Sequence, residues 1–338
     1  MPFCFIQNAI RIICINVIIC NKQWHTNLSF KCKAKGGNFM DINIIGVPIF
    51  YGADKRGPEY GPEKLREKNI VEVIGKHNHR VFDFGDLFVP QVKEYNKFFS
   101  HPNMKYLDPI VQVNNNLAHI VYSSIKSGSF PLIIGGDHSI GLGSVAGVSR
   151  ASKKFAVVWV DAHGDINTHE TSESANVHGM SLAKAMGIGY PDLVDVYFKG
   201  KKVENEHVYI VGARDLDKGE YDLIKKEDLN VYTAKRIHEY GLEYVVNEVL
   251  DNLKKKDIDT IHLSFDLDFI DAQFVPGTGT PVPEGMTIDE AKTLLKIFAE
   301  SGLVKSMDFV ELNPLLDRND MTADLAIDLL DWTFKYMA

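Results

Sequence analysis

Cysteine is absent from most of this 338-residue chain: all four cysteines lie within residues 1–39, and none follows Met40. The chain from Met40 onward can therefore offer neither disulfide bonds nor thiolate metal ligands. Acidic side chains are absent from residues 1–39, which hold five of the 37 basic side chains, whereas all 45 acidic ones follow later. The net charge of −8 argues against a nucleic-acid-binding surface.

Hydrophobic runs long enough to cross a bilayer are also missing. The apolar stretch from Ile12 to Cys20 has nine residues, whereas a membrane span takes about 20. The stretch has the size of the hydrophobic part of a signal peptide, and a basic, acid-free segment also fits an organellar transit segment. Because Met40 directly precedes the first strand pattern, residues 1–39 could equally be an upstream extension or a disordered tail. We expect a non-core extension at 1–39 and one domain at 40–338 of a cytoplasmic protein, unless the extension targets it to an organelle or for secretion.

Short apolar runs rich in Val and Ile alternate with helical patterns from residue 40 to the end. Such continuous runs are typical of parallel strands that are covered on both faces. Strands are predicted near residues 42–47, 79–84, 131–134, 155–160, 207–211, 229–232, 260–265 and 304–311. Helices are predicted over 108–127 and 242–254, after a capping box at Thr287 and Glu290, and over 320–336 with Asn319 or Asp320 as its cap. The alternation predicts a three-layer α/β/α fold with a mostly parallel, eight-stranded sheet.

Three of the predicted strands run directly into side chains that bind metals. These side chains are Asp161, His163 and Asp165 after residues 155–160, His138 after residues 131–134, and Asp266 and Asp268 after residues 260–265. In an extended backbone, alternate residues point to the same side. Ligands of parallel sheets bind at the carboxyl ends of the strands, so we expect all six side chains at one edge of the sheet.

Four carboxylates and two imidazoles at one place require positive counter-charge. About two divalent cations would supply it. Oxygen-rich ligation without thiolates favours Mn²⁺ over structural Zn²⁺, and two ions about 3.5–4 Å apart can ionise a water between them. A single motif could be a turn or a helix cap, and Gly135-Gly136 is compatible with a phosphate loop, but no Gly-Lys-Ser/Thr follows. The three motifs together predict a two-metal hydrolase.

The full motifs resemble the three signatures of the ureohydrolases, the arginase and agmatinase superfamily. They are Gly-Gly-Asp-His-Ser at 135–139, Asp-Ala-His-Gly-Asp-Ile-Asn at 161–167 and Ser-Phe-Asp-Leu-Asp-Phe-Ile-Asp at 264–271. The resemblance extends over residues 40–338, which it marks as the expected catalytic domain. It implies two Mn²⁺ per subunit and a hydroxide between them that attacks the guanidinium carbon of the substrate. One ion would be held by His138, Asp161, Asp165 and Asp266, and the other by Asp161, His163, Asp266 and Asp268.

Within the superfamily the chain is similar to arginases, because Ile166-Asn167 and Ser174–Gly179 follow the arginase pattern. The resemblance implies hydrolysis of L-arginine to L-ornithine and urea. It also implies the substrate contacts, which would be Asn167, Ser174 and Asn176 for the α-carboxylate, Asp217 and Glu220 for the α-ammonium, and Thr280 beside the guanidinium. The implied catalytic residues are His178, which would pass a proton to the departing amine, Glu311, which would pair with the guanidinium, and Asp268, which would orient the hydroxide.

Three positions depart from the arginase pattern. Gly164 stands where Thr is common, Gly277 where Ala is common, and His169-Glu170 replaces Pro-Leu. None of these changes removes a predicted ligand. The alternatives are an agmatinase-type ureohydrolase, a ureohydrolase for another guanidino compound, and a non-catalytic, metal-stabilised arginase homologue. The resemblance further suggests a homotrimer or homohexamer. We expect no nucleic-acid partner, and no membrane partner for the core at 40–338.

Overall fold

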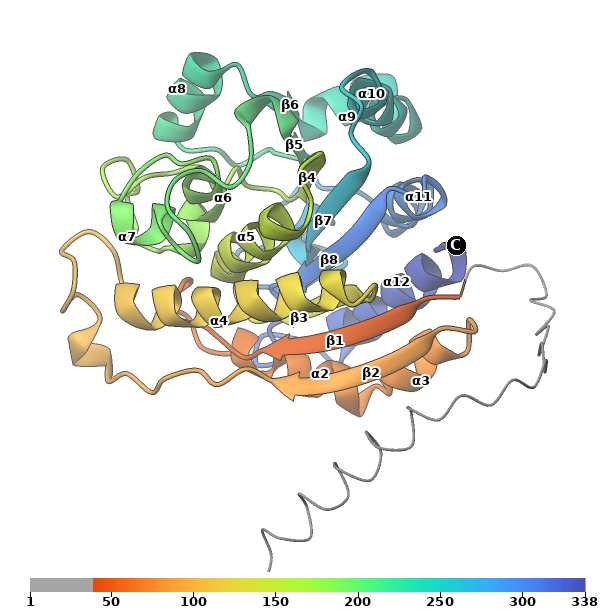
Figure 1. Ribbon diagram of the computed structural model, residues 1–338, viewed down its shortest axis with the longest axis horizontal. Helices are drawn as coiled ribbons and strands as arrows, with labels where there is room; N and C mark the ends of the chain where they lie inside the picture. Colours follow the sequence, from red (N-terminus) through yellow and green to blue (C-terminus); the bar gives the residue numbers. More distant parts are fainter. Residues whose placement is uncertain (1–38, 338) are drawn as a thin grey trace, which may run out of the picture. The chain divides into compact units, whose positions relative to one another are not determined.

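The computed structural model describes residues 39–337, so the predicted extension lies outside the described part except for Phe39. A single sheet has the strand order β2-β1-β3-β8-β7-β4-β5-β6. Its strands are β1 (Asp41–Val47), β2 (Arg80–Asp86), β3 (Phe130–Gly135), β4 (Phe155–Val160), β5 (Val208–Val211), β6 (Asn230–Tyr232), β7 (Thr260–Asp266) and β8 (Val304–Val310). Every pairing between these strands is parallel, so the sheet is fully rather than mostly parallel (Figure 1).

All eight predicted strands are confirmed, with ends that differ from the prediction by at most two residues. The six strands inside the sheet are almost entirely buried, as their Val- and Ile-rich runs indicate. Strand β2 is different, because it lies at the edge of the sheet and leaves Phe82 and Phe84 exposed. The apolar runs therefore mark the central strands, which carry the predicted ligands.

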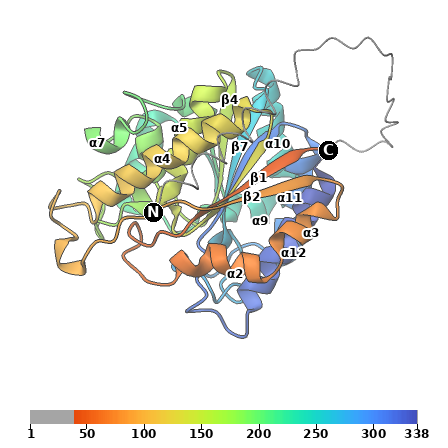
Figure 2. The same cartoon turned by 60° about the horizontal axis from the view of Figure 1, so that its bottom comes forward.

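Helices cover both faces of the sheet (Figure 2). They are α2 (Gly61–Glu67), α3 (Ile70–Gly75), α4 (Leu107–Lys126), α5 (Gly141–Ala151), α6 (Ser181–Ala185), α7 (Pro191–Val194), α8 (Lys218–Glu227), α9 (Ala234–Tyr240), α10 (Leu242–Lys255), α11 (Ile288–Glu300) and α12 (Met321–Tyr336). One hydrophobic cluster joins the sheet to α2, α3 and α9–α12, and a second joins its other face to α4–α8. The predicted three-layer architecture is thus confirmed. In the described residues, no helix is both long and apolar enough to cross a membrane.

Two helix caps were predicted, and one is confirmed. The capping box of α11 is present: Glu290 N donates to Thr287 Oγ1 at 3.2 Å, and Thr287 N donates to Glu290 Oε2 at 2.8 Å. The predicted cap of α12 by Asn319 or Asp320 is wrong. Asp317 accepts the hydrogen bonds from the first amides of this helix, including that of Thr322 at 2.9 Å. Asp320 has a left-handed backbone without a side-chain cap.

Strand order explains why distant motifs meet. Strands β3, β8, β7 and β4 are consecutive neighbours in the sheet, although they come from four separate parts of the chain. Because they are parallel, their carboxyl ends lie along the same edge. Residues that follow these four strands, from His138 to Glu311, are therefore brought together at that edge.

Candidate metal centre and substrate cavity

The six predicted metal ligands lie together at the carboxyl edge of the sheet. Ligand atoms of His138, Asp161 and Asp165 fall within 4.8 Å of one another, and those of Asp161, His163 and Asp268 form a second such group. Asp161 belongs to both groups. The sixth residue, Asp266, has its Oδ2 3.2 Å from Nδ1 of His138. The arrangement therefore offers two adjoining cation positions with Asp161 between them.

Short local hydrogen bonds fix the carboxylates after the strands end. Asp161 Oδ1 accepts from the amide of His163 at 2.7 Å, and Asp266 Oδ1 accepts from the amide of Asp268 at 2.9 Å. Each carboxylate thus closes a turn two residues on, which leaves its other oxygen directed at the cluster. Trp159, which lies in β4, contacts two of the ligands. Its indole N–H donates to Asp161 Oδ2 at 3.0 Å, and its ring stacks on that of His138 with the ring centroids 3.9 Å apart.

The buried charges of this cluster conflict without a cation. Burial and the carboxylate of Asp161 raise the pKa of Asp165 well above its usual value, and burial with Asp268 and Asp161 does the same to Asp266. Burial opposes charge on His138, but hydrogen bonds with Asp161 and Asp266 outweigh it and raise the pKa of the imidazole. Among the described residues, Asp165 Oδ2 is buried and accepts no hydrogen bond, although it lies 3.2 Å from Nδ1 of His138. An oxygen-rich donor set with an unpartnered carboxylate oxygen fits a hard divalent cation.

His178, which is partly buried, and Glu311, which is buried, form a pair beside the cluster. Nδ1 of His178 lies 3.2 Å from Oε1 of Glu311, which also accepts from the amide of His138 at 2.9 Å. Burial disfavours the imidazolium, but the contact with Glu311 outweighs it and raises the pKa of His178 to about 9. The second oxygen of Glu311, Oε2, is buried and has no hydrogen-bond partner among the described residues. It is therefore available to a cationic group.

A cavity of about 120 Å³ opens onto the cluster. It is lined by His163, Asp165, Asn167, Ser172, Ser174, His178, Gly179, Asp215, Asp217, Glu220, Asp266 and Thr280. Two of these polar side chains were not predicted. Asp215 Oδ2 lies 3.8 Å from His163 Nε2, and the Arg-Asp-Leu-Asp run that holds it was the sequence signal. Ser172 precedes the predicted donor Ser174, and no local pattern distinguishes it.

Asn176, a predicted substrate contact, does not line this cavity. Its Oδ1 accepts from Lys105 Nζ at 2.8 Å, and its Nδ2 donates to the carbonyl of Ala53 at 2.9 Å. Glu220 lines the cavity, but its two oxygens accept from the amides of Asp217 and Ile166 at 2.9 and 3.1 Å. Burial raises the pKa of Glu220 to about 7. Both residues thus hold backbone segments around the cavity.

Packing accounts for two of the departures from the arginase pattern. A Cβ on Gly164 would lie 2.8 Å from Glu220 Oε1, so a larger residue would displace a carboxylate that binds two amides. A Cβ on Gly277 would lie 2.7 Å from Cβ of Asp317, whose side chain caps α12. The third departure, His169, packs its ring against those of His101 and Tyr190, with centroids 5.3 and 5.4 Å away.

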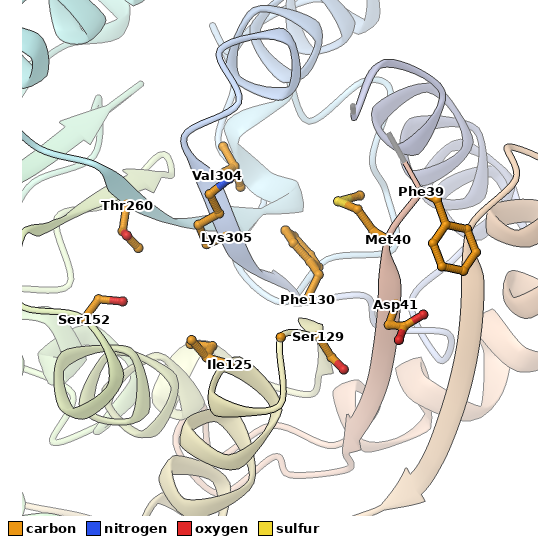
Figure 3. A pocket seen from close by; sticks show the side chains of 11 residues that line it. Phe39, Met40, Asp41, Ile125, Ser129, Phe130, Ser152, Thr260, Val304 and Lys305 are labelled. Carbon is orange, nitrogen blue, oxygen red and sulfur yellow. The ribbon is translucent and has the colours of Figure 1, made fainter. Parts of the chain in front are cut away.

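A larger cavity, of about 520 Å³, lies at the opposite edge of the sheet (Figure 3). Its lining includes the first residues of β1, β3, β7 and β8. Asp41 in this cavity pairs with Arg80, and the ammonium of Lys305 donates to the carbonyl of Gly302. Among residues 39–337, none of those that line it is a histidine. The smaller cavity, which combines acids, imidazoles and hydroxyls, is therefore the candidate active site.

The fold and the site define a hydrolase with a three-layer α/β/α architecture and a candidate carboxylate–histidine metal site at the carboxyl edge of its parallel sheet. The sequence model of the Arginase family matches residues 40–334 of the chain. The chain therefore belongs to this family, as its motifs predicted. The arginase of Brevibacillus brevis is 41% identical over 294 residues, which are 87% of this chain and 97% of that protein. Among solved structures, arginase from Bacillus cereus is 39% identical, with a TM-score of 0.81, and the match covers 87% of this chain and 98% of the other. Entamoeba histolytica arginase in complex with L-ornithine is 32% identical, with a TM-score of 0.81 over 88% of this chain and 98% of the other.

Proposed function

We propose that this chain is a binuclear manganese arginase that converts L-arginine and water to L-ornithine and urea. One observation carries the proposal: a single cavity is lined both by cluster residues, including Asp165, and by His178 and the polar 167–174 segment. A guanidinium group beside the cluster would thus place the amino-acid end of the same molecule among hydroxyls, amides and acids. The relatives named arginase at up to 41% identity support this substrate.

The donor set supports two Mn²⁺ ions. We assign one ion to His138, Asp161, Asp165 and Asp266, and the other to Asp161, His163, Asp266 and Asp268. Carboxylates and imidazoles without thiolates suit Mn²⁺. The pKa values of Asp165 and Asp266 are raised because burial leaves their ionised forms without a counter-charge, which bound cations would supply. When bound, a pair of such ions lowers the pKa of water enough to supply hydroxide at neutral pH.

Protein groups would orient the substrate and move its protons. Oε2 of Glu311, which is buried and unpartnered among the described residues, would accept a hydrogen bond from the guanidinium. Asp268 would orient the attacking oxygen, and its Oδ2 is itself positioned by the hydroxyl of Thr280 at 3.0 Å. As the C–N bond to the ornithine nitrogen breaks, His178 would donate a proton to that nitrogen. Against the effect of burial, the contact with Glu311 favours the protonated imidazole, which raises the pKa of His178 in the metal-free protein and suits it to give up a proton in this step.

The amino-acid end of the substrate would be read by the loop after β4 and by the start of α8. Asn167 and Ser174 would donate to the α-carboxylate, whereas Asp217 would accept from the α-ammonium. Asn167 Nδ2 donates to Asp217 Oδ2 at 2.7 Å, so these two groups already lie side by side. For Asn176 and Glu220 we propose an indirect part in this binding, because their side chains hold Ala53 and Ile166 in place.

The test is urea release by the purified protein loaded with Mn²⁺, with L-arginine and agmatine compared. Agmatine lacks the α-carboxylate, so we expect kcat/KM to be at least about a hundredfold higher for L-arginine. Glu311→Gln, which keeps the size of the side chain but removes the charge that pairs with the guanidinium, should lose most of the activity. Preference for agmatine would support the agmatinase-type alternative. Absence of urea from a protein that binds two Mn²⁺ would support the non-catalytic homologue.

The proposal extends to the domain boundaries, the N-terminal extension and the assembly of the chain. We propose that residues 40–338 form the catalytic domain and that residues 1–39 are an extension, which is supported by a family match that starts at residue 40. A homotrimer or homohexamer is proposed from the family resemblance. Light scattering would measure the assembly, and N-terminal sequencing of the natural protein would test whether Met40 is its first residue and whether the extension has a targeting role.

A further inference from the structure

A row of polar side chains lies inside the sheet beneath the metal centre. Strands β7 and β8 pair in register, with His262 opposite Ser306 and Ser264 opposite Asp308. All four residues are fully buried. Alternate residues of a strand share one face, so this row faces a single helix layer, to which α5 contributes the buried Ser144. A polar row of this kind in the middle of an apolar sheet needs a reason, because burial of polar groups is costly.

Three donors converge on one oxygen of Asp308. Its Oδ2 accepts from Ser144 Oγ at 2.6 Å and from Ser264 Oγ at 3.2 Å, and it lies 3.0 Å from His262 Nε2. On its other side, His262 contacts Ser306 Oγ through Nδ1 at 2.8 Å. The hydroxyl of Ser264 also lies 2.8 Å from Nε2 of His138. A continuous chain of buried contacts therefore joins His138 to Asp308 through Ser264.

The direction of these bonds follows from what each group can donate. An ionised carboxylate only accepts, so Ser264 gives its single proton to Asp308. Its oxygen must then accept the N–H at Nε2 of His138. The other ring nitrogen, Nδ1, faces the cluster, where it lies 2.9 Å from Asp161 Oδ2 and 3.2 Å from Asp165 Oδ2. With its proton kept at Nε2, the imidazole can present a lone pair at Nδ1 to a metal ion.

We propose that Asp308 is a positioning residue of the metal centre, which acts through Ser264 to hold His138 in the orientation and tautomer that bind the metal. Ser144 and His262 in turn keep the acceptor oxygen of Asp308 in place. The inference rests on the proposed function, since it takes His138 to be a metal ligand. It extends the site two residues beyond the ligands, into the core of the sheet.

The decisive variant is Asp308→Asn, which preserves size and removes the charge. If the amide oxygen faces the three donors, it is a weaker acceptor than the carboxylate. If the amide nitrogen faces them, the hydroxyl proton of Ser264 loses its acceptor. It then either stays unpaired in the core or turns toward Nε2 of His138, which shifts the imidazole proton to Nδ1. Both orientations disturb the imidazole. Ser264→Ala is a smaller change that cuts the same chain directly and serves where Asp308→Asn fails to fold.

The matched control is Ser306→Ala. It removes a hydrogen bond from the same buried row, on the far side of His262, but leaves the link between Asp308 and His138 intact. A purely structural role of the row predicts that all three variants lose stability and bind Mn²⁺ alike. A positioning role predicts that Asp308→Asn and Ser264→Ala weaken Mn²⁺ binding, whereas Ser306→Ala does not.

The measurement is the Kd for Mn²⁺ of each full-length protein, obtained from the electron paramagnetic resonance signal of free Mn²⁺ during titration. Loss of a partner that orients a metal ligand costs about 10- to 100-fold in affinity. We expect a loss of at least about tenfold for Asp308→Asn and Ser264→Ala, and a change within about twofold for Ser306→Ala. Wild-type affinity in the first two variants, or equal losses in all three, would overturn the inference. Failure of the wild-type protein to bind Mn²⁺ would instead overturn the proposed function, and this inference with it.

Discussion

Single residues outside the cavity hold in place the loop that we propose binds the substrate. Lys105 is the main example: its backbone amide donates to the carbonyl of Ala175 at 3.0 Å, and its ammonium donates to Asn176 Oδ1 at 2.8 Å. The same ammonium lies 2.9 Å from Asp54, which also pairs with Lys97 at 3.0 Å. Ala175 has a left-handed backbone, with φ of 60°, which an unsupported alanine disfavours. Lys105 therefore stabilises a strained segment between the cavity residues Ser174 and His178.

We predict that Lys105→Met raises KM for L-arginine about tenfold and changes kcat by less than about threefold. Loss of one charge-assisted hydrogen bond of about 1.5 kcal/mol accounts for this factor. The loop would bind substrate less well, whereas the metal cluster would be unchanged. Steady-state urea release measures both constants. The control is Lys97→Met, which removes an ion pair with Asp54 but no contact with the loop, and should leave KM within about twofold. A fall in kcat at unchanged KM would contradict the role given to Lys105.

Among the elements, helix α8 connects the cavity wall to the rest of the fold. Its capping box joins Asp217 and Glu220. The second oxygen of Glu220 accepts from the amide of Ile166, which lies in the loop after β4 that also carries Asp161, His163 and Asp165. One buried side chain thus begins the helix and anchors the segment that follows Asp165. Position 164 is glycine in this chain, which leaves space for the carboxylate of Glu220.

We predict that Glu220→Gln lowers the free energy of unfolding by about 1–2 kcal/mol, because glutamine has one oxygen for two amide donors. Chemical denaturation of the metal-loaded protein measures this loss. Asp222→Asn is the control, since this exposed acid of the same helix should change stability by less than about 0.5 kcal/mol. A rise in KM without any loss of stability would favour a direct contact of Glu220 with the substrate over its role in holding the helix and loop.

The elements also show what sequence patterns can and cannot predict. The eight strands and the cluster residues were predictable, because strand periodicity and the i, i+2 spacing of ligands are local. Helix α5 was not predicted: three of its residues are Gly141, Gly143 and Gly147, which fit against Trp159, Asn114 and Ala118 where a side chain would clash. The cap of α12 by Asp317 and the contact of Lys105 with Asn176 were missed for a related reason. Both depend on how separate loops pack, which periodicity does not report.

For the whole molecule, the order of strands concentrates negative charge at one edge of the sheet. Four carboxylates from the ends of β4 and β7 are almost completely buried there, beside His138 from the end of β3. Hydrophobic clusters on both faces of the sheet hold this arrangement against the repulsion. When no cation is bound, repulsion among these carboxylates lowers the free energy of unfolding. The size of this loss depends on pH, because the carboxylates titrate.

We predict that removing the metal destabilises the protein more at pH 9 than at pH 6.5. In the metal-free protein, burial and neighbouring carboxylates raise the pKa of Asp165, Asp266 and Asp268, so stability falls as pH rises through these values. The pKa of His138 is also raised, against the effect of burial, by hydrogen bonds to acids, and the stability that this gives is likewise lost as pH rises through the raised pKa. Mn²⁺ at 100 times the Kd measured at pH 6.5 should add about 2.7 kcal/mol at that pH, or about 5 °C in Tm. The same Mn²⁺ concentration should add more at pH 9, where the deprotonated ligands bind the ion more tightly. Calorimetry with Mn²⁺ and with a chelator, at constant ionic strength kept by potassium chloride, measures the difference. A chelator effect that is equal at both pH values would show that the cluster charges are balanced without metal.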